Sequence, residues 1–284
     1  MKNILTLLLT VLTSFSMMAD VSFSDKAVLL KLYKATNGDN WTTKWDLNTP
    51  ISTWYGVKLD GDKVIAINLS DNNLVGEIPS EISSLVNLQE LNLHKNNISG
   101  SIPYALENLK ELKVLDLSFN KLTGIIPATI CEMNNLKDLE LYMNRISGEL
   151  PSQIGNLKSL ETLAVFNNEI EGQIPNSLYE VKTLKVLLLN SNKIVGKLSV
   201  NVANLENLEN LSLFENNMDG QVPFDLEKLN NLKEMNISYN MFSGLTSRKL
   251  AVLDTLNMTM VNDKGVAVLL DVKMDVERPL VSED

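Results

Sequence analysis

Histidine and cysteine, which often act as bases, nucleophiles and metal ligands, each occur once in this 284-residue chain, as His94 and Cys131. A single histidine does not support a metal site built from imidazoles, and we expect His94 to be a surface side chain, not part of a Ser-His-Asp triad. A single cysteine excludes an intramolecular disulfide bond. Cys131 has no evident partner base, so we do not expect a nucleophile there; varied residues at equivalent places in the chain suggest partial exposure.

Paired carboxylates are the remaining residues that could support catalysis. Asp116 and Glu140 are 24 residues apart, and Glu90 and Asp138 share a second recurring position. On neighbouring strands of a parallel sheet, about 4.8 Å apart, such carboxylates would come within range of a glycosidase-like pair. An open sheet, however, offers no pocket that would desolvate one carboxyl group and raise its pKa. We therefore predict that the protein is not an enzyme and has no catalytic, cofactor-binding or metal-binding residues.

The elements that would position these side chains follow from a 24-residue period. Leucine recurs with this step at Leu88, Leu112, Leu136, Leu160, Leu184, Leu208 and Leu232. Val64 occupies the same position 24 residues before Leu88. Asparagine keeps the same step: Asn72, Asn96, Asn120, Asn144, Asn168, Asn192, Asn216 and Asn240. Glycine does so too: Gly76, Gly100, Gly124, Gly148, Gly172, Gly196, Gly220 and Gly244. The chain therefore contains eight consecutive repeats without an insertion.

The repeat unit, LxxLxLxxNxLxGxIPxxLxxLxx, has a physical reason at each fixed position. Apolar residues at positions 4 and 6 alternate with polar ones, which indicates a strand with one buried face. The asparagine at position 9 can satisfy backbone groups where the chain turns inward, and glycine at position 13 permits a second bend. Stacked units would form a parallel sheet. We predict an α/β solenoid, a right-handed curved superhelix of eight 24-residue repeats with a concave parallel β-sheet.

This unit resembles the plant-type leucine-rich repeat, which is marked by Gly-x-Ile-Pro. The match runs over residues 64–245, with proline at 79, 103, 127, 151, 175 and 223. The resemblance is to plant receptor ectodomains and polygalacturonase-inhibiting proteins. It is specific for the fold and implies binding of another macromolecule, but it does not identify the ligand.

The two ends of the chain depart from the repeat. Lys2, the apolar run 4–12 and Ala19 predict a signal peptide at residues 1–19, which is too short in its apolar part to span a membrane. Residues 20–63 are expected to cap the first repeat, with a helix, three tryptophans and a hairpin at Asp60-Gly61. Residues 246–284 are expected to form a C-terminal cap, including two strands around 262–265, and an acidic tail.

The N-terminal cap bears on the origin of the protein. The run LYKATNGDNW, residues 32–41, resembles the caps of secreted bacterial proteins with such repeats. The run WYGV, residues 54–57, resembles plant caps, which carry a flanking cysteine pair that this chain lacks. The resemblance therefore favours an exported bacterial member, which would be secreted, periplasmic or at the cell surface.

Ligand recognition is expected on the concave face, where positions 3, 5, 7 and 8 vary between repeats. Apolar and aromatic residues gather there on the middle and later repeats: Phe119, Tyr142, Met143, Ala164, Phe166, Leu188, Phe214 and Tyr239. Glu90, Asp116, Asp138 and Glu140 would form an acidic margin. An apolar patch with a charged rim is typical of an interaction site. The alternative is that these side chains only pack on one another across strands.

The sequence therefore predicts an extracytoplasmic module that recognises a protein, peptide or glycan through its concave face. Alternatives are an inhibitor of a secreted enzyme, a structural or adhesive envelope protein and, less favoured, a hydrolase or an ice-binding protein. The net charge of −10 argues against nucleic acid as a partner. We expect a monomer without a cofactor and without membrane insertion after cleavage of the signal peptide.

Overall fold

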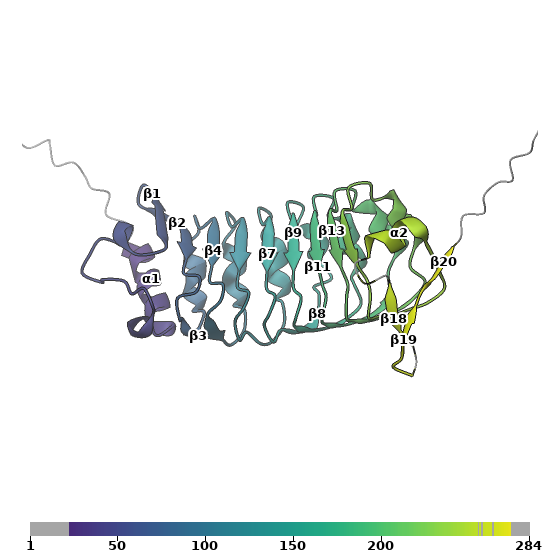
Figure 1. Ribbon diagram of the computed structural model, residues 1–284. Coiled ribbons are helices and arrows are strands. Elements are labelled where there is room, and N and C mark those ends of the chain that lie inside the picture. Colours follow the sequence, from purple (N-terminus) through teal and green to yellow (C-terminus); the bar gives the residue numbers. More distant parts are fainter. Residues whose placement is uncertain (1–22, 255, 257, 263, 274–284) are drawn as a thin grey trace, which may run out of the picture.

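The 24-residue period folds into coils that stack side by side along one axis (Figure 1). The computed structural model describes residues 23–254, 256, 258–262 and 264–273. The predicted signal peptide, residues 1–19, and the end of the predicted acidic tail lie outside the described residues. Helix α1 (Phe23–Ala35) lies at one end of the array, and helix α2 (Arg248–Leu253) lies at the other.

The main sheet has nine strands in the order β1-β2-β4-β6-β7-β9-β11-β13-β15. Only β1 and β2 are antiparallel, and they form the hairpin expected at Asp60-Gly61. From β2 onwards each strand pairs in parallel with the strand one repeat later. The strands are β1 (Val57–Asp60), β2 (Lys63–Asn68), β4 (Glu90–Asn92), β6 (Val114–Asp116), β7 (Asp138–Glu140), β9 (Thr162–Ala164), β11 (Val186–Leu188), β13 (Asn210–Ser212) and β15 (Glu234–Asn236). The structure therefore confirms the predicted solenoid with its parallel sheet.

A second row of short parallel strands forms around the recurring glycine at position 13, where the sequence indicated only a bend. Five of these strands pair in the order β16-β14-β12-β10-β8, and β3 pairs with β5. Their bounds are β3 (Val75–Glu77), β5 (Asn97–Ser99), β8 (Ser147–Glu149), β10 (Glu169–Gly172), β12 (Lys193–Lys197), β14 (Asn217–Gly220) and β16 (Met241–Phe242). Short 3₁₀ helices complete the coils: Ser80–Ser84, Tyr104–Asn108, Ala128–Glu132, Ile154–Asn156, Asn176–Glu180, Val200–Asn204 and Phe224–Lys228.

The asparagine at position 9 ties each coil to the one before it. Asn120 Nδ2 donates to Leu93 O of the preceding coil at 2.9 Å and to Leu117 O of its own coil at 3.1 Å. Its Oδ1 accepts from Ile98 N of the preceding coil at 2.9 Å. Equivalent bonds recur at other members of the ladder. The ladder therefore faces inward, as predicted, and satisfies backbone groups that the turn leaves unpaired.

The glycine at position 13 is required for two reasons. Gly148 and Gly172 have φ values of 76° and 75°, a region that other residues rarely occupy. A Cβ at Gly148 would lie 2.8 Å from Ile125 Cγ2, and one at Gly172 would lie 2.6 Å from Glu149 Cγ. In both cases the colliding side chain belongs to the preceding repeat, so glycine also permits the close approach of adjacent coils.

Aromatic side chains close the N-terminal end of the apolar core. Trp41, Trp45 and Trp54 are at most 3% exposed, and each indole Nε1 donates to a backbone carbonyl. Trp45 stacks on Trp54 with ring centroids 4.7 Å apart, and Tyr33 of α1 stacks on Trp45 at 5.9 Å. These rings join the same core cluster as the leucines of the first repeats.

The last repeat is closed differently. The buried carboxylate of Asp254 accepts from Ile237 N at 2.7 Å and from Ser238 Oγ at 2.9 Å, where a further coil would otherwise supply partners. Leu256 keeps the 24-residue register in the sequence but is 40% exposed, and Met258 is buried instead. Beyond it, β18 (Thr259–Val261) and β19 (Ala267–Leu269) form an antiparallel hairpin, while β20 (Asp271–Lys273) pairs with β17 (Leu245–Ser247).

Cys131 corrects one expectation from the sequence. Its side chain is fully buried in the 3₁₀ helix Ala128–Glu132 rather than partly exposed. Burial, with a smaller contribution from the charge of Glu132, raises the pKa of the thiol to about 12. The residue types at equivalent positions did not reveal this burial, because they range from Gly155 to Tyr179 and Glu227 and only some of them are buried.

We predict that Asn120→Ala lowers the free energy of unfolding by about 1–3 kcal/mol, because Ile98 N loses its partner and Leu93 O loses one of its two side-chain donors. The matched control is Asn134→Ala, at an exposed asparagine outside the ladder, which should cost no more than about 0.5 kcal/mol. Urea unfolding followed by circular dichroism measures both. Equal midpoints for the two variants would contradict the role of the ladder.

Candidate functional site

The concave face is built by the main sheet and by the two residues that precede each ladder asparagine. The residue at position 8 has a positive φ in every repeat, between 51° and 57°: Asp71, Lys95, Phe119, Met143, Asn167, Ser191, Glu215 and Tyr239. None of these is glycine, so each coil holds a conformation that costs roughly 1–2 kcal/mol for most residue types. The residue types at position 8 do not indicate this positive φ. The position is recognisable only because it directly precedes the ladder asparagine.

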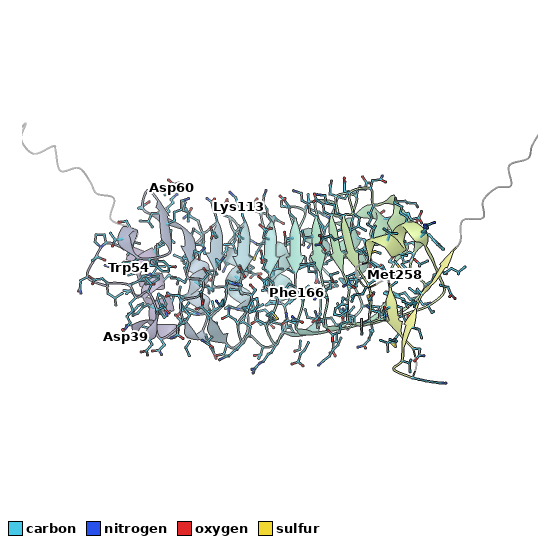
Figure 2. The ribbon with its side chains drawn as sticks, viewed as in Figure 1. Asp39, Trp54, Asp60, Lys113, Phe166 and Met258 are labelled. Atoms are coloured by element: carbon cyan, nitrogen blue, oxygen red, sulfur yellow. The ribbon has the colours of Figure 1, made fainter. Side chains whose placement is uncertain are left out.

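Four rings from successive coils form a continuous line, which we call the aromatic row: His94, Phe119, Tyr142 and Phe166. His94 meets Phe119 edge to face, with centroids 5.3 Å apart, and Phe119 meets Tyr142 in the same way at 5.5 Å. Tyr142 and Phe166 are stacked, with centroids 4.4 Å apart and planes 9° from parallel. Figure 2 shows Phe166 near the middle of the array.

The eight side chains predicted to form the patch do not contribute equally. Phe119, Met143 and Tyr239 are exposed, whereas Tyr142, Phe166, Leu188 and Phe214 are half-buried. Ala164 is only 3% exposed, so the expectation that it offers contact surface is corrected. The reason is that the register places it between Glu140 and Leu188, whose longer side chains flank its methyl group.

The patch is also divided, although the sequence suggested one continuous surface. Phe214 and Tyr239 form a separate edge-to-face pair with centroids 5.3 Å apart. A hollow of about 310 Å³ lies over strands β11, β13 and β15, next to the last ring of the aromatic row. Its lining includes Phe166, Leu188, Asn190, Ser212 and Met235.

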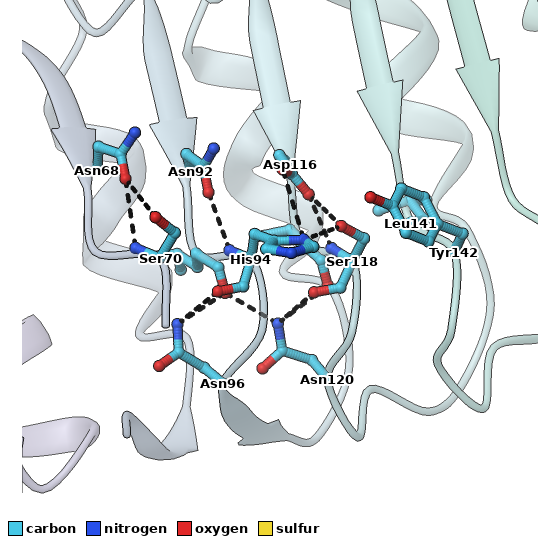
Figure 3. Close-up of polar contacts among 12 residues, drawn as sticks. Asn68, Ser70, Asn92, His94, Asn96, Asp116, Ser118, Asn120, Leu141 and Tyr142 are labelled. Atoms are coloured by element: carbon cyan, nitrogen blue, oxygen red, sulfur yellow. Dashed lines mark hydrogen bonds and ion pairs between the residues drawn. The ribbon is translucent and has the colours of Figure 1, made fainter. Parts of the chain in front are cut away.

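His94 lies on this face, as expected, but its side chain is only 28% exposed and is held by polar contacts. Its Nδ1 lies 2.7 Å from Ser118 Oγ and 3.8 Å from Asp116 Oδ2 (Figure 3). Ser118 Oγ donates to Asp116 Oδ1. The repeat positions of these residues predict a common face, but they do not predict that the side chains are in contact.

The order of these hydrogen bonds differs from that of a nucleophilic triad. The Ser118 proton is directed at the Asp116 carboxylate, so Ser118 Oγ accepts from His94 Nδ1. In a triad the histidine lies between the carboxylate and the serine and accepts the serine proton. Ser118 is moreover fully buried. The network is therefore suited to fixing the ring of His94 in the aromatic row.

Glu140 corrects another expectation, because the open sheet does desolvate a carboxyl group. Burial, followed by the charges of Asp116 and Asp138, raises the pKa of Glu140 to about 6. Asp116 is its direct neighbour in the sheet register. Among the described residues, no basic side chain lies within ion-pair distance of Glu140 or Asp138.

Comparisons with known proteins agree with this architecture. A family model described as "Leucine-rich repeat region" matches residues 100–262, and one described as "Leucine Rich Repeat" matches residues 63–85 and 87–109. The chain therefore belongs to the leucine-rich-repeat family.

Among curated proteins, the receptor-like kinase TMK4 of Arabidopsis thaliana is 33% identical over 85 residues, which are 30% of this chain and 9% of that protein. Among solved structures, the plant peptide hormone receptor RGFR1 in complex with RGF2 has a TM-score of 0.64 at 29% identity, covering 73% of this chain and 32% of that one. A plant ice-binding protein has a TM-score of 0.73 at 23% identity, covering 89% and 81%, a likeness of fold alone. The chain thus spans 9% of the TMK4 sequence and about a third of the RGFR1 chain.

No helix in the described part of the chain has the length and apolar character needed to cross a membrane.

We predict a pH-dependent effect of Glu140→Gln. The folded-state pKa of about 6 lies above the ordinary value, so ionised Glu140 destabilises the fold above about pH 6, and this cost vanishes where the group is protonated in both states. Because glutamine resembles the protonated form, the variant should be more stable by about 1–2 kcal/mol at pH 8 and unchanged at pH 4. Urea unfolding at both pH values measures the difference.

Glu111→Gln is the matched control, because Glu111 is exposed and lies outside the sheet. It should leave the free energy of unfolding within about 0.5 kcal/mol of wild type at both pH values. The same gain at pH 4 and pH 8 for Glu140→Gln would show that the effect is not due to the ionised carboxylate.

Proposed function

We propose that this protein is an extracytoplasmic binding module that holds a protein, peptide or glycan ligand on the concave face of its repeats. The observation that carries the proposal is the aromatic row, whose rings come from neighbouring coils at positions that the repeat leaves free. Such rings offer a large contact area with few rotamers to immobilise, which is why they are common among binding hot spots.

The relatives support this proposal. The RGFR1 structure is that of a plant peptide hormone receptor in complex with RGF2, and the TMK4 relative is a receptor-like kinase. This chain resembles only a part of those proteins. Within this chain, the aromatic row is the feature that could contact a ligand. Of the three ligand classes, a protein or peptide is the one that the receptor relatives favour.

The remaining parts of the proposal rest on the sequence. We propose that residues 1–19 direct export, that residues 20–63 and 246–284 flank a repeat array of residues 64–245, and that the protein acts as a monomer. The run LYKATNGDNW supports a bacterial exported protein, which would be secreted, periplasmic or retained at the surface. Inhibition of a secreted enzyme or an adhesive role would use the same concave face, so the identity of the captured ligand decides between them.

We predict that Phe166→Ala weakens ligand binding by about 1–2 kcal/mol, or roughly 5- to 30-fold. The ligand is first captured on wild-type protein from the extracellular fraction of the producing organism, and its affinity for each variant is then measured by titration calorimetry. Tyr104→Ala is the matched control, because Tyr104 is a 59% exposed ring on a 3₁₀ helix away from the main sheet.

Leu141→Ala separates the binding site from the scaffold. Leu141 precedes Tyr142 but is fully buried, so this variant should lose about 2–5 kcal/mol of folding stability, while Phe166→Ala, at a half-buried ring, should lose less. If Phe166→Ala binds like wild type while Tyr104→Ala binds more weakly, the ligand site is not on the concave face.

A further inference from the structure

We propose, on the basis of the concave site proposed above, that its ligand is an extended peptide segment in which a basic residue and an aromatic or aliphatic residue are separated by one residue. The basic side chain would lie against Asp138 and Glu140 of β7. The apolar side chain would lie on the stacked rings of Tyr142 and Phe166.

The charge on this face selects the class of partner. Positions 3, 5, 7 and 8 of the eight repeats hold the acidic residues Asp71, Glu90, Asp116, Asp138, Glu140, Glu215 and Glu234. The one lysine or arginine at these positions is Lys95, and its Nζ lies 3.1 Å from Asp71 Oδ2. The unpartnered sheet face is thus complementary to a cationic ligand and repels an acidic one.

The lysines nearest to β7 do not neutralise its carboxylates. Lys137 and Lys185 both contact the carboxylate of Glu161, at 3.0 and 2.6 Å. Lys113 Nζ donates to Gln89 Oε1 at 3.0 Å. These contacts link residues at position 2 of successive repeats and so run along the sheet, beside the acidic positions. Neither Asp138 nor Glu140 therefore forms an ion pair with these lysines.

The carboxylates on and next to β7 differ in the hydrogen-bond partners that they have within the protein. Asp116 is bonded to Ser118 and lies close to His94, and Glu90 Oε1 accepts from Asn68 Nδ2 at 3.3 Å. Glu140 is paired with Asp116 in the register of β6 and β7, so two like charges lie next to each other on adjacent strands. A cation at Glu140 would relieve this repulsion and would restore the solvation that burial removes.

The spacing of the two contacts fits an extended peptide. Glu140 and Tyr142 are two residues apart, which corresponds to roughly 6–7 Å along an extended backbone. Alternate side chains of an extended ligand that runs along the strand have the same separation and point to the same side. Phe166, stacked on Tyr142 from the next coil, widens the apolar contact in the direction across the strands.

The experiment uses a displayed library of random twelve-residue peptides, which is selected in parallel on four forms of the full chain. These are wild type, Asp138→Asn/Glu140→Gln, Phe166→Ala and the control Tyr104→Ala. On wild type and on Tyr104→Ala, we expect enrichment of peptides with arginine or lysine two residues from an aromatic or aliphatic residue. The carboxylate variant should select peptides without this basic preference, because amides keep the shape of the site and remove its charge.

The best wild-type peptide is then synthesised with arginine and with citrulline, a neutral residue of nearly the same shape. Replacement by citrulline should weaken binding to wild type at least tenfold and should change binding to Asp138→Asn/Glu140→Gln less than threefold. The wild-type arm compares two peptides on one folded protein, so it does not depend on the stability of any variant.

The outcomes separate this inference from the proposed function. Enriched peptides without basic bias that are lost on Phe166→Ala would overturn the cationic ligand and leave the concave site in place. Enrichment that is equal on Phe166→Ala and wild type would move the site elsewhere and overturn the proposed function as well. Absence of enrichment over a bare surface would count against both.

Discussion

The fold depends on one constraint: every coil of the array has a turn whose buried backbone groups must be paired with a side chain. The ladder asparagine meets this constraint with one amide, which donates to carbonyls of two coils and accepts from a backbone N–H of the preceding one. No apolar side chain could replace it, because a buried unpaired backbone group costs about 1–3 kcal/mol. The same bonds fix how far adjacent coils are offset, and the parallel register of the main sheet follows from that offset.

The fixed offset makes the concave face a regular framework for recognition. Position 7 lies immediately before the left-handed residue and two residues before the asparagine, so its backbone is held from both sides. Tyr142 and Phe166 stack because equivalent residues of successive coils are neighbours in space, although they are 24 residues apart in the sequence. Substitution at these positions changes the surface and leaves the ladder intact. Specificity can therefore vary while the scaffold stays the same.

The sequence predicted whatever depends on the period alone: the solenoid, the inward asparagines and the face on which each side chain lies. It failed where the outcome depends on the sizes and charges of neighbours across strands. Ala164 is buried because Glu140 and Leu188 flank it, and Glu140 has a raised pKa because it is buried beside Asp116. The contact between His94 and Ser118 likewise requires the rotamers of two coils. In all three cases the sequence evidence lies in comparing residues at the same repeat position, 24 residues apart, because these become neighbours across strands.

Glu140 shows how a solenoid can hold an unfavourable group. Its raised pKa corresponds to an electrostatic cost of about 1–2 kcal/mol at neutral pH, comparable to the contribution of one well-formed hydrogen bond. In a repeat protein each coil contacts mainly its neighbours, so this cost is confined to a few coils, while the ladder stabilises them on both sides. A core residue of similar cost would disturb packing, whereas a carboxylate at a free position affects only the charge of the face. The concave positions are therefore where this fold can carry unneutralised charge without losing its register.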